Sequence, residues 1–199
     1  MKRTWCILLL LLFFNQLMAS SSVVITEPVD LCGGEMILPY KTDIVFKDQG
    51  CVYNGRILGN GGRIIVRNQK PVFDNIKLSG NFSNNKSYLS WWNCKEDITD
   101  EILSLVSCFE GKVFIDIPGK LSSSVNVKGR DRFVLDGCGN TITIDNVAGA
   151  AINIVEVSDL EIKSIIFKYA GCDFGNEKNV QAIRIEHGNI NSSVVVDNI

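Results

Sequence analysis

The chain has 199 residues, of which 46% are hydrophobic and 21% charged, and its formal net charge is −2. This composition is ordinary for a folded globular protein and argues against an intrinsically disordered chain. The charge balance also argues against a nucleic-acid-binding protein, because such proteins concentrate Lys and Arg on one face.

The N-terminus has the organisation of a secretory signal peptide. Lys2 and Arg3 precede an apolar run over residues 5–14, and small residues follow over 19–22. The run is too short to cross a bilayer as a helix. We therefore expect residues 1–22 to be removed on export to the periplasm, cell surface or extracellular space, with no stable membrane insertion afterwards. Loss of Lys2 and Arg3 would reduce the 20 basic residues to 18, against 22 acidic ones.

Six cysteines would remain in the exported chain, and an even number permits disulfides in an oxidising compartment. Their spacings are long and irregular, and they lack the paired CxxC pattern of a structural zinc site. We expect half or more of them to be small buried hydrophobic residues. The six are Cys32, Cys51, Cys94, Cys108, Cys138 and Cys172.

From residue 23 onward, short runs rich in Val, Ile, Leu and Phe alternate with Gly, Asn and Asp, as in "RIIV", "RFVLDG" and "LEIKSIIF". Such runs predict short strands separated by turns. We expect residues 23–86 to form a diverged N-terminal β module. Its sequence matches a later stretch of the chain when Cys32 is placed on Cys108 and Pro39 on Pro118.

The stretch 87–118 differs from its surroundings. It contains Tyr88, Trp91 and Trp92, then an acidic cluster, then apolar residues at helical spacing. The cluster could bind calcium or supply a pair of acids for glycoside cleavage. The favoured interpretation is structural, because acidic residues stabilise the first turn of a helix and Asp97 or Thr99 can cap it. The acidic residues are Glu96, Asp97, Asp100 and Glu101, and the apolar face is Ile102, Leu105, Val106 and Phe109.

The three aromatic residues are the carbohydrate-contact candidates, since flat apolar rings suit the faces of sugar rings. Adjacent residues of a strand point to opposite faces. We therefore expect one of Trp91 and Trp92 to pack inward and the other to be available to a ligand.

The C-terminal part of the chain repeats a polar turn followed by apolar positions at every second residue. Asp131, Asp159 and Asn189 take the same place in three successive copies, and the two steps between them are nearly equal in length. Strands that recur at such a period without intervening helices predict a solenoid, whose inward positions form apolar ladders. An antiparallel sandwich is the alternative, and the Asn-Gly of "YNGRI" and the Asp-Gly of "LDGCG" could close its hairpins.

The segment "WWNCKEDITDEILSLVSCFEGKVFIDIPGKLSSSVNVKG" resembles the entry segment of right-handed parallel β-helix proteins of the pectate-lyase-like superfamily, including phage tailspikes. The later "VSDLEIKSIIF" resembles the repeated turn of that superfamily. The resemblance implies an all-β solenoid, a right-handed parallel β-helix with one short α-helix at the N-terminal side of the main coil. Residues 87–199 would be the entry segment and coils, expected to be incomplete at the C-terminus.

The resemblance also implies an exported β-helix that acts on or binds polysaccharide, as a lyase or glycoside hydrolase. The alternative is a non-catalytic surface or adhesion module. No metal site is expected from the sequence. Besides the acidic cluster, calcium could lie between acidic residues of neighbouring turns, with Asp136, Asp145 and Asp159 as ligands beside Arg132 or Arg184. The single histidine, His187, is expected to be an ordinary turn residue.

Overall fold

The structure is a computed structural model that describes residues 22–68, 71–145, 147, 149–170, 181–186 and 193–197, the last segment by its backbone alone. Cys172, His187, Asn189 and all but the last residue of the predicted signal peptide lie outside the described residues. The expectations that concern them remain predictions.

The described chain is a succession of strands with one α-helix near its middle. The strands before the helix are β1 (Ser22–Ile25), β2 (Pro28–Asp30), β3 (Glu35–Ile37), β4 (Asp43–Phe46), β5 (Cys51–Asn60), β6 (Ile64–Val66), β7 (Phe73–Asn81) and β8 (Lys86–Tyr88). The remaining elements are the 3₁₀ turn η2 (Leu89–Trp91), α2 (Thr99–Cys108), β9 (Lys112–Phe114), β10 (Gly119–Leu121), β11 (Val125–Asp145), β12 (Ala150–Ala170), β13 (Gln181–Glu186) and β14 (Ser193–Asp197).

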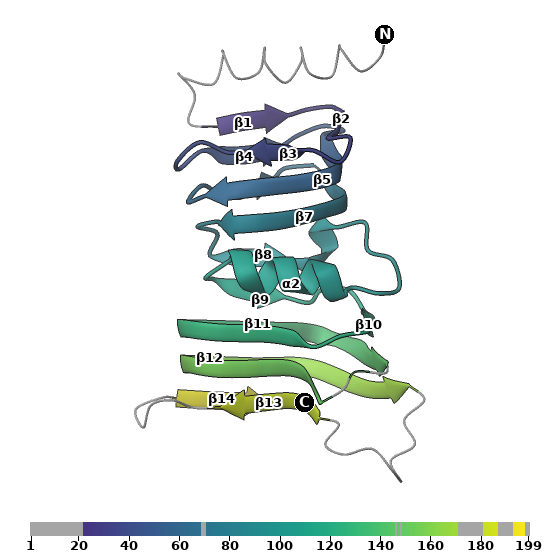
Figure 1. Ribbon diagram of the computed structural model, residues 1–199, viewed down its shortest axis with the longest axis vertical. Helices are drawn as coiled ribbons and strands as arrows, with labels where there is room; N and C mark the ends of the chain where they lie inside the picture. Colours follow the sequence, from purple (N-terminus) through teal and green to yellow (C-terminus); the bar gives the residue numbers. More distant parts are fainter. Residues whose placement is uncertain are drawn as a thin grey trace.

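The strands form a parallel β-solenoid of about six turns, stacked along the long axis of the molecule (Figure 1). All pairings between the described strands are parallel. One sheet has the order β1-β4-β6, a second joins β2 and β3 to β5 and then β7, and the third has the order β8-β9-β11-β12-β13 with β10 and β14 added. The predicted solenoid is confirmed, and the sandwich is wrong because its hairpins would be antiparallel. The right-handed sense of the coil stays a prediction.

The two dipeptides that could have closed hairpins lie inside long strands instead. Asn54-Gly55 belongs to β5, and Asp136-Gly137 belongs to β11. Asn54 itself has a φ angle of 56°, and Cys138, which follows Asp136-Gly137, has a φ angle of 53°. Left-handed backbone of this kind turns the chain locally. These polar residues therefore bend the coil rather than reverse the chain.

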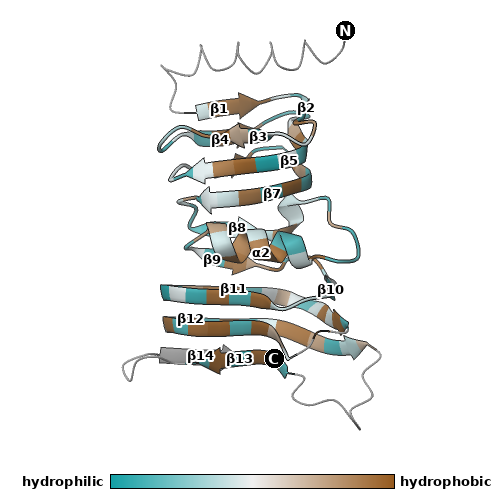
Figure 2. Cartoon of the chain, viewed as in Figure 1, coloured by the Kyte–Doolittle hydropathy of each residue, from teal (hydrophilic) through white to brown (hydrophobic). Residues whose placement is uncertain are grey.

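Apolar residues in register on successive turns fill the interior. Val52 of β5 pairs with Phe73 of β7, and Leu135 of β11 pairs with Ile162 of β12. All four are buried and belong to a single continuous core that runs through both halves of the coil. Apolar and polar bands accordingly alternate along the strands (Figure 2).

The register differs from the one expected for the last repeats. Asp159 lies opposite Arg132, not Asp131, and its partner on the next turn is Ser193, not Asn189. The first error is a shift to the adjacent residue, which in a strand moves a side chain to the opposite face. The offset between partners also changes further along the same two strands, because the β11–β12 register shifts between Asp136 and Asn140.

The match between Cys32 and Cys108 is also wrong. Cys108 is buried at the end of α2, whereas Cys32 is exposed in a turn with φ of 52°. The structural equivalent of Cys32 is Cys138, with φ of 53°. The backbone N–H of each donates to the aspartate two positions earlier, at 2.8 Å for Cys32 and 3.0 Å for Cys138.

Helix α2 occupies one turn of the coil between β7 and β11 (Figure 1). Its predicted apolar face is confirmed: Ile102, Leu105, Val106 and Phe109 are all buried. The Phe109 ring stacks on Phe82 at the end of β7, with 5.4 Å between ring centroids. The helix therefore continues the core across a turn in which a strand of the second sheet is missing.

Side chains make hydrogen bonds on both sides of α2. On the β7 side, the Trp92 indole N–H donates to Ile76 O at 2.9 Å, and the Leu78 N–H donates to the Ser104 hydroxyl at 3.3 Å. On the other side, the Arg130 guanidinium donates to Val106 O and Phe109 O at the end of α2. A cation there also complements the negative end of the helix.

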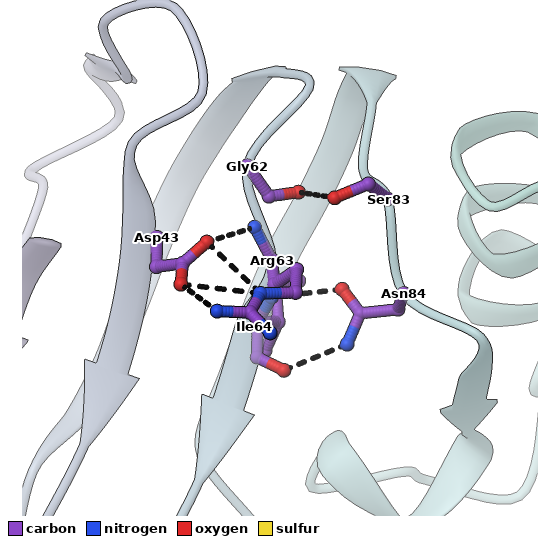
Figure 3. A network of polar contacts seen from close by, with 6 residues as sticks. All are labelled: Asp43, Gly62, Arg63, Ile64, Ser83 and Asn84. Atoms are coloured by element: carbon purple, nitrogen blue, oxygen red, sulfur yellow. Dashed lines mark hydrogen bonds and ion pairs between the residues drawn. The ribbon is translucent and has the colours of Figure 1, made fainter. Parts of the chain in front are cut away.

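Side-chain hydrogen bonds also take the place of a neighbouring strand at the edge of the first sheet, next to β6. The Asn84 side chain accepts from the Ile64 N–H and donates to Ile64 O, both at 2.8 Å, and so makes the pair of bonds that another strand would make (Figure 3). On the opposite side of this strand, Asp43 holds Arg63 through its backbone N–H at 2.8 Å and its guanidinium at 2.7 Å. Burial acts to raise the pKa of Asp43, but the bonds from Arg63 outweigh it and lower the pKa.

Candidate functional site

Two short strands on neighbouring turns present the same pair of side chains on the outside of the third sheet. In β8 and β9, Lys86 lies opposite Lys112 and Tyr88 lies opposite Phe114. The residues between them, Ser87 and Val113, are fully buried. Because side chains alternate along a strand, the lysines and the rings share the outer face. We call the four residues Lys86, Tyr88, Lys112 and Phe114 the Lys–aromatic face.

The two rings of this face form a stack. Their centroids are 5.0 Å apart and their planes differ by 16°. Both rings are half-buried, and the Lys86 ammonium lies 5.9 Å from the centroid of the Phe114 ring. The face therefore combines apolar ring surface with positive charge.

On the next two turns, the positions in register with Tyr88 and Phe114 are occupied by charged residues. Asp136 lies opposite Phe114, and Lys163 lies opposite Asp136. The Lys163 ammonium is 3.8 Å from the Asp136 carboxylate and 2.7 Å from the Glu161 carboxylate. The hydrogen bond from Lys163 is the main reason that the pKa of Glu161 is lowered. Donors and acceptors thus follow the rings along the coil axis.

Neither tryptophan faces outward, so the expectation that one would do so is wrong. Trp91 is 4% exposed and Trp92 is 3% exposed. The alternation of a strand does not apply because Trp91 ends the 3₁₀ turn η2 and Trp92 follows it. Trp91 packs against Phe109, with 5.7 Å between centroids, and Trp92 packs against Phe73 at 5.0 Å. Of the three aromatic candidates, only Tyr88 lies on the outer face.

The acidic cluster lies at the start of the helix, and Asp100 and Glu101 are in its first turn as predicted, but the expected N-cap is wrong because the N-cap residue is Ile98, which makes no side-chain capping hydrogen bond. The Asp97 carboxylate accepts hydrogen bonds from the Thr99 N–H at 3.0 Å and from the Thr99 hydroxyl at 2.7 Å, and also from the Ser122 hydroxyl. Asp100 pairs with Lys77 of β7 at 3.0 Å. Burial raises the pKa of Glu101, which lies on α2 and not on the Lys–aromatic face. Within the described residues, no three His, Cys, Asp or Glu side chains are grouped so that they could hold a metal ion.

The three aspartates considered as calcium ligands are not brought together, so that expectation is wrong. Asp136 lies within β11 and Asp145 at its end, whereas Asp159 lies opposite Arg132 on the other strand. Each aspartate has a basic neighbour instead. The ion pairs are Asp136–Lys163, Asp145–Lys120 and Asp159–Arg132.

A shallow hollow of about 310 Å³ lies beside β10 and β11. It has no aromatic side chain, and its one ammonium group, from Lys120, pairs with Asp145. This hollow therefore lacks the ring surface of the Lys–aromatic face. Its lining residues are Glu96, Pro118, Gly119, Lys120, Thr141 and Thr143.

The cysteines are less buried than expected. Of the five in the described part of the chain, only Cys108 is buried, and all five are free thiols. Cys32 lies in a turn and Cys138 lies at a bend within β11 where φ is 53°, and both are exposed, whereas Cys51 and Cys94 are half-buried. Burial raises the pKa of Cys94 to about 12, with further contributions from Glu101 and Asp116. Such a thiol is a poor nucleophile at neutral pH.

Sequence reasoning missed Lys112 and Phe114. The signal was present, because "KSY" at residues 86–88 and "KVF" at residues 112–114 share the pattern Lys, any residue, aromatic residue. Two copies of this pattern that are separated by one turn of the coil place like side chains side by side. Recognising them requires the register, which depends on the length of the turn that contains α2.

No protein-family model matches the sequence. Comparison with curated proteins and with solved structures gave no significant match either. In the part of the chain that the structure describes, no helix is long and apolar enough to span a bilayer.

Proposed function

We propose that this protein is an exported β-solenoid that binds polysaccharide on the Lys–aromatic face. The observation that carries the proposal is the stack of Tyr88 and Phe114 on the outside of the third sheet, continued along the axis by Asp136 and Lys163. Sugar rings have apolar faces edged by hydroxyl groups. Half-buried rings can cover such faces, and neighbouring carboxylates and ammonium groups can accept from and donate to the hydroxyls.

The shape of the site suits a polymer better than a small molecule. Small ligands prefer concave pockets that bury most of their surface. The Lys–aromatic face instead lies on an open sheet, and its row continues over neighbouring turns about 4.8 Å apart. A chain of sugars that lies along the coil axis could contact several turns at once.

We favour binding over catalysis. Glycoside cleavage by a pair of acids requires one carboxyl group that stays protonated, which means a raised pKa. Beside the rings, Glu161 has a lowered pKa because of Lys163, and Asp136 pairs with the same lysine. The Asp116 carboxylate accepts hydrogen bonds from the Ser90 N–H and hydroxyl. These acids are suited to holding neighbouring side chains and sugar hydroxyls. Binding by these groups needs no metal ion.

The signal peptide and the resemblance to pectate-lyase-like β-helices support the setting of this proposal. Residues 1–22 would direct the chain out of the cytoplasm. Outside the cell it would meet extracellular and cell-surface polysaccharides. A right-handed coil and membership of that superfamily are part of the same proposal. The adhesion alternative differs in its ligand, which would be another protein surface.

The test is binding of the purified protein to a panel of immobilised polysaccharides. We expect Tyr88→Ala and Phe114→Ala each to weaken binding about tenfold, the factor that corresponds to 1.4 kcal/mol. Tyr88→Phe keeps the ring and should retain most of the affinity. Tyr53→Ala is the matched control, since Tyr53 is a half-buried tyrosine on β5 of the second sheet. Thermal melting of each variant checks that it is folded. Equal binding by folded Tyr88→Ala and Tyr53→Ala would contradict the proposal.

A further inference from the structure

Charged residues that lie opposite each other on neighbouring turns are generally paired with the opposite charge. This holds in both halves of the coil and on all three sheets. Oppositely charged residues are in register at Lys163–Asp197 and Asp97–Lys120. Four pairs on neighbouring turns form ion pairs, Glu35–Arg56, Asp43–Arg63, Arg132–Asp159 and Asp136–Lys163, with closest nitrogen–oxygen distances of 3.9, 2.7, 3.5 and 3.8 Å.

Lys86 and Lys112 do not follow this pattern. They lie directly opposite each other, and neither makes an ion pair with another residue in the described part of the chain. Like charges at such positions repel and destabilise a sheet. The nearest acidic residue in their row is Glu161, two turns beyond Lys112. Its carboxylate contacts Lys163, whose hydrogen bond is the main cause of its lowered pKa, and Lys112 adds only a weaker electrostatic contribution without forming an ion pair.

One other pair of like charges shows how the coil ordinarily offsets this repulsion. Arg56 lies opposite Lys77 on β5 and β7. Glu35 lies beside Arg56 on the preceding turn, at 3.9 Å, and Asp100 lies beside Lys77 at 3.0 Å. Two carboxylates therefore form ion pairs with these two cations, whereas no carboxylate among the described residues forms an ion pair with Lys86 or Lys112.

The position of the lysine pair connects it with the rings. Each lysine stands two positions before a ring on its own strand, and residues so spaced are about 6.6 Å apart on the same face. A group held between the two ammonium groups would therefore belong to a ligand that also reaches Tyr88 and Phe114. An oxyanion could accept hydrogen bonds from both ammonium groups and would remove their repulsion.

We infer that the polysaccharide bound at the Lys–aromatic face is anionic, with a carboxylate or sulfate group seated between Lys86 and Lys112. The inference rests on the proposed function and adds the class of sugar to it. Recognition is divided between the two halves of the face: the rings contact the sugar ring, and the lysines select its charge. Because the lysines are at the surface, the charge-dependent part of the affinity should fall as salt is added.

The experiment compares polymers that share a backbone but differ in charge. The pairs are dextran with dextran sulfate, hydroxyethyl cellulose with carboxymethyl cellulose, and methyl-esterified with free polygalacturonate. The first pair tests sulfate and the other two test carboxylate. Poly-L-glutamate serves as an anionic polymer without sugars. Affinities are measured at low and high salt for the wild type and for the double variant Lys86→Gln/Lys112→Gln.

The matched control is Arg56→Gln/Lys77→Gln, which removes the same two charges from an in-register pair on the second sheet. We expect the wild type and this control to bind the charged member of at least one pair about tenfold more tightly than the neutral member, the ratio that one lost charge-assisted contact of about 1.4 kcal/mol would produce. Lys86→Gln/Lys112→Gln should lose that preference while it still binds the neutral polymer.

Each other outcome overturns a defined part of the proposal. Equal preference for charge in the two double variants, or no preference in the wild type, overturns the anionic ligand but leaves the proposed function standing if Tyr88→Ala still weakens binding. Lysine-dependent binding that is insensitive to Tyr88→Ala, or that is equally strong for poly-L-glutamate, overturns polysaccharide recognition and leaves a general anion site. Absence of binding to every polymer overturns both.

Discussion

Two kinds of contact join neighbouring turns of this coil. Between β11 and β12, strand lies on strand from Val125–Ile152 to Asp145–Ala170, with one shift of register between Asp136 and Asn140. Between β7 and β11, helix α2 takes the place of a strand, and the bonds on either side come mainly from the side chains of Trp92, Ser104 and Arg130, beside one backbone bond from the Phe82 N–H to Cys108 O at 2.8 Å. The first contact depends on backbone and the second mainly on individual side chains.

The difference predicts where the fold is sensitive to mutation. A side chain lost from the β11–β12 contact leaves the backbone ladder intact. A side chain lost from the α2 turn leaves a buried backbone group without a partner, which costs the full desolvation of that group. The same chemical change should therefore cost more at α2 than between β11 and β12.

The largest effect is expected at Trp92. Trp92→Ala removes a buried ring that packs on Phe73 and also the donor to Ile76 O, so we expect a loss of about 3–5 kcal/mol in the free energy of unfolding. Trp92→Phe keeps most of the packing and isolates the hydrogen bond. Trp91→Phe is the control, since it makes the same replacement of an indole by a smaller ring at a position that is equally buried. Denaturant unfolding at equilibrium measures each value. Equal losses for Trp92→Phe and Trp91→Phe would show that the bond to Ile76 contributes nothing.

The next effect compares two arginines of β11. Arg130 is half-buried and donates to Val106 O and Phe109 O, so Arg130→Ala should cost about 2–3 kcal/mol, as for charge-assisted bonds. Arg132 is exposed and pairs with Asp159 at 3.5 Å, so Arg132→Ala should cost about 0–1 kcal/mol. Denaturant unfolding of both variants measures the difference. If the two losses were the same, the contrast between the helix turn and the strand contact would not hold.

A smaller effect is expected at Ser104 of α2. Ser104→Ala removes the acceptor for the Leu78 N–H and should cost about 1 kcal/mol. Ser107→Ala is the control on the same helix, because the exposed Ser107 hydroxyl bonds back to Leu103 O and alanine is the better helix former. Hydrogen exchange of the Leu78 amide should quicken in the first variant and stay unchanged in the second. Unchanged exchange in both would contradict the role assigned to Ser104.

Much of the fold could be predicted from the sequence, because it depends on local patterns. Alternating apolar residues indicated the strands, their regular recurrence indicated the solenoid, and the spacing of Ile102, Leu105 and Val106 indicated the helix. The register could not be predicted, because the turns vary in length. Leu135 of β11 lies opposite Ile162, and Ile142 lies opposite Phe167, so the offset between partners changes within a single pair of strands. The sequence pattern alone does not show where such a change of offset occurs.

The candidate site was predicted only in part, and for the same reason. Tyr88 was identified because an aromatic residue is conspicuous in sequence. Phe114 and Lys112 become its partners only through the register across the α2 turn. Trp91 and Trp92 were placed wrongly because the sequence reads as a strand where the chain forms the turn η2. A binding site on a solenoid surface can therefore be recognised only when the neighbours of each side chain on other turns are known.

The smallest effect tests a side-chain contact inside the strand-on-strand part of the coil. The pKa of Asp43 is lowered in the folded protein by Arg63, so the stability that this pair contributes is present above the ordinary pKa of 3.8 and is lost as the pH falls through the lower folded-state value. At neutral pH, Asp43→Asn should lower the melting temperature by less than Ser104→Ala does, because backbone pairing between β4 and β6 remains. That difference from the wild type should shrink as the pH is lowered from 6 towards 3. Asp131→Asn, an exposed residue of β11, is the control and should show no such dependence. A gap for Asp43→Asn that stayed constant with pH would mean that the carboxylate charge adds nothing, and that even here the backbone ladder alone joins the turns.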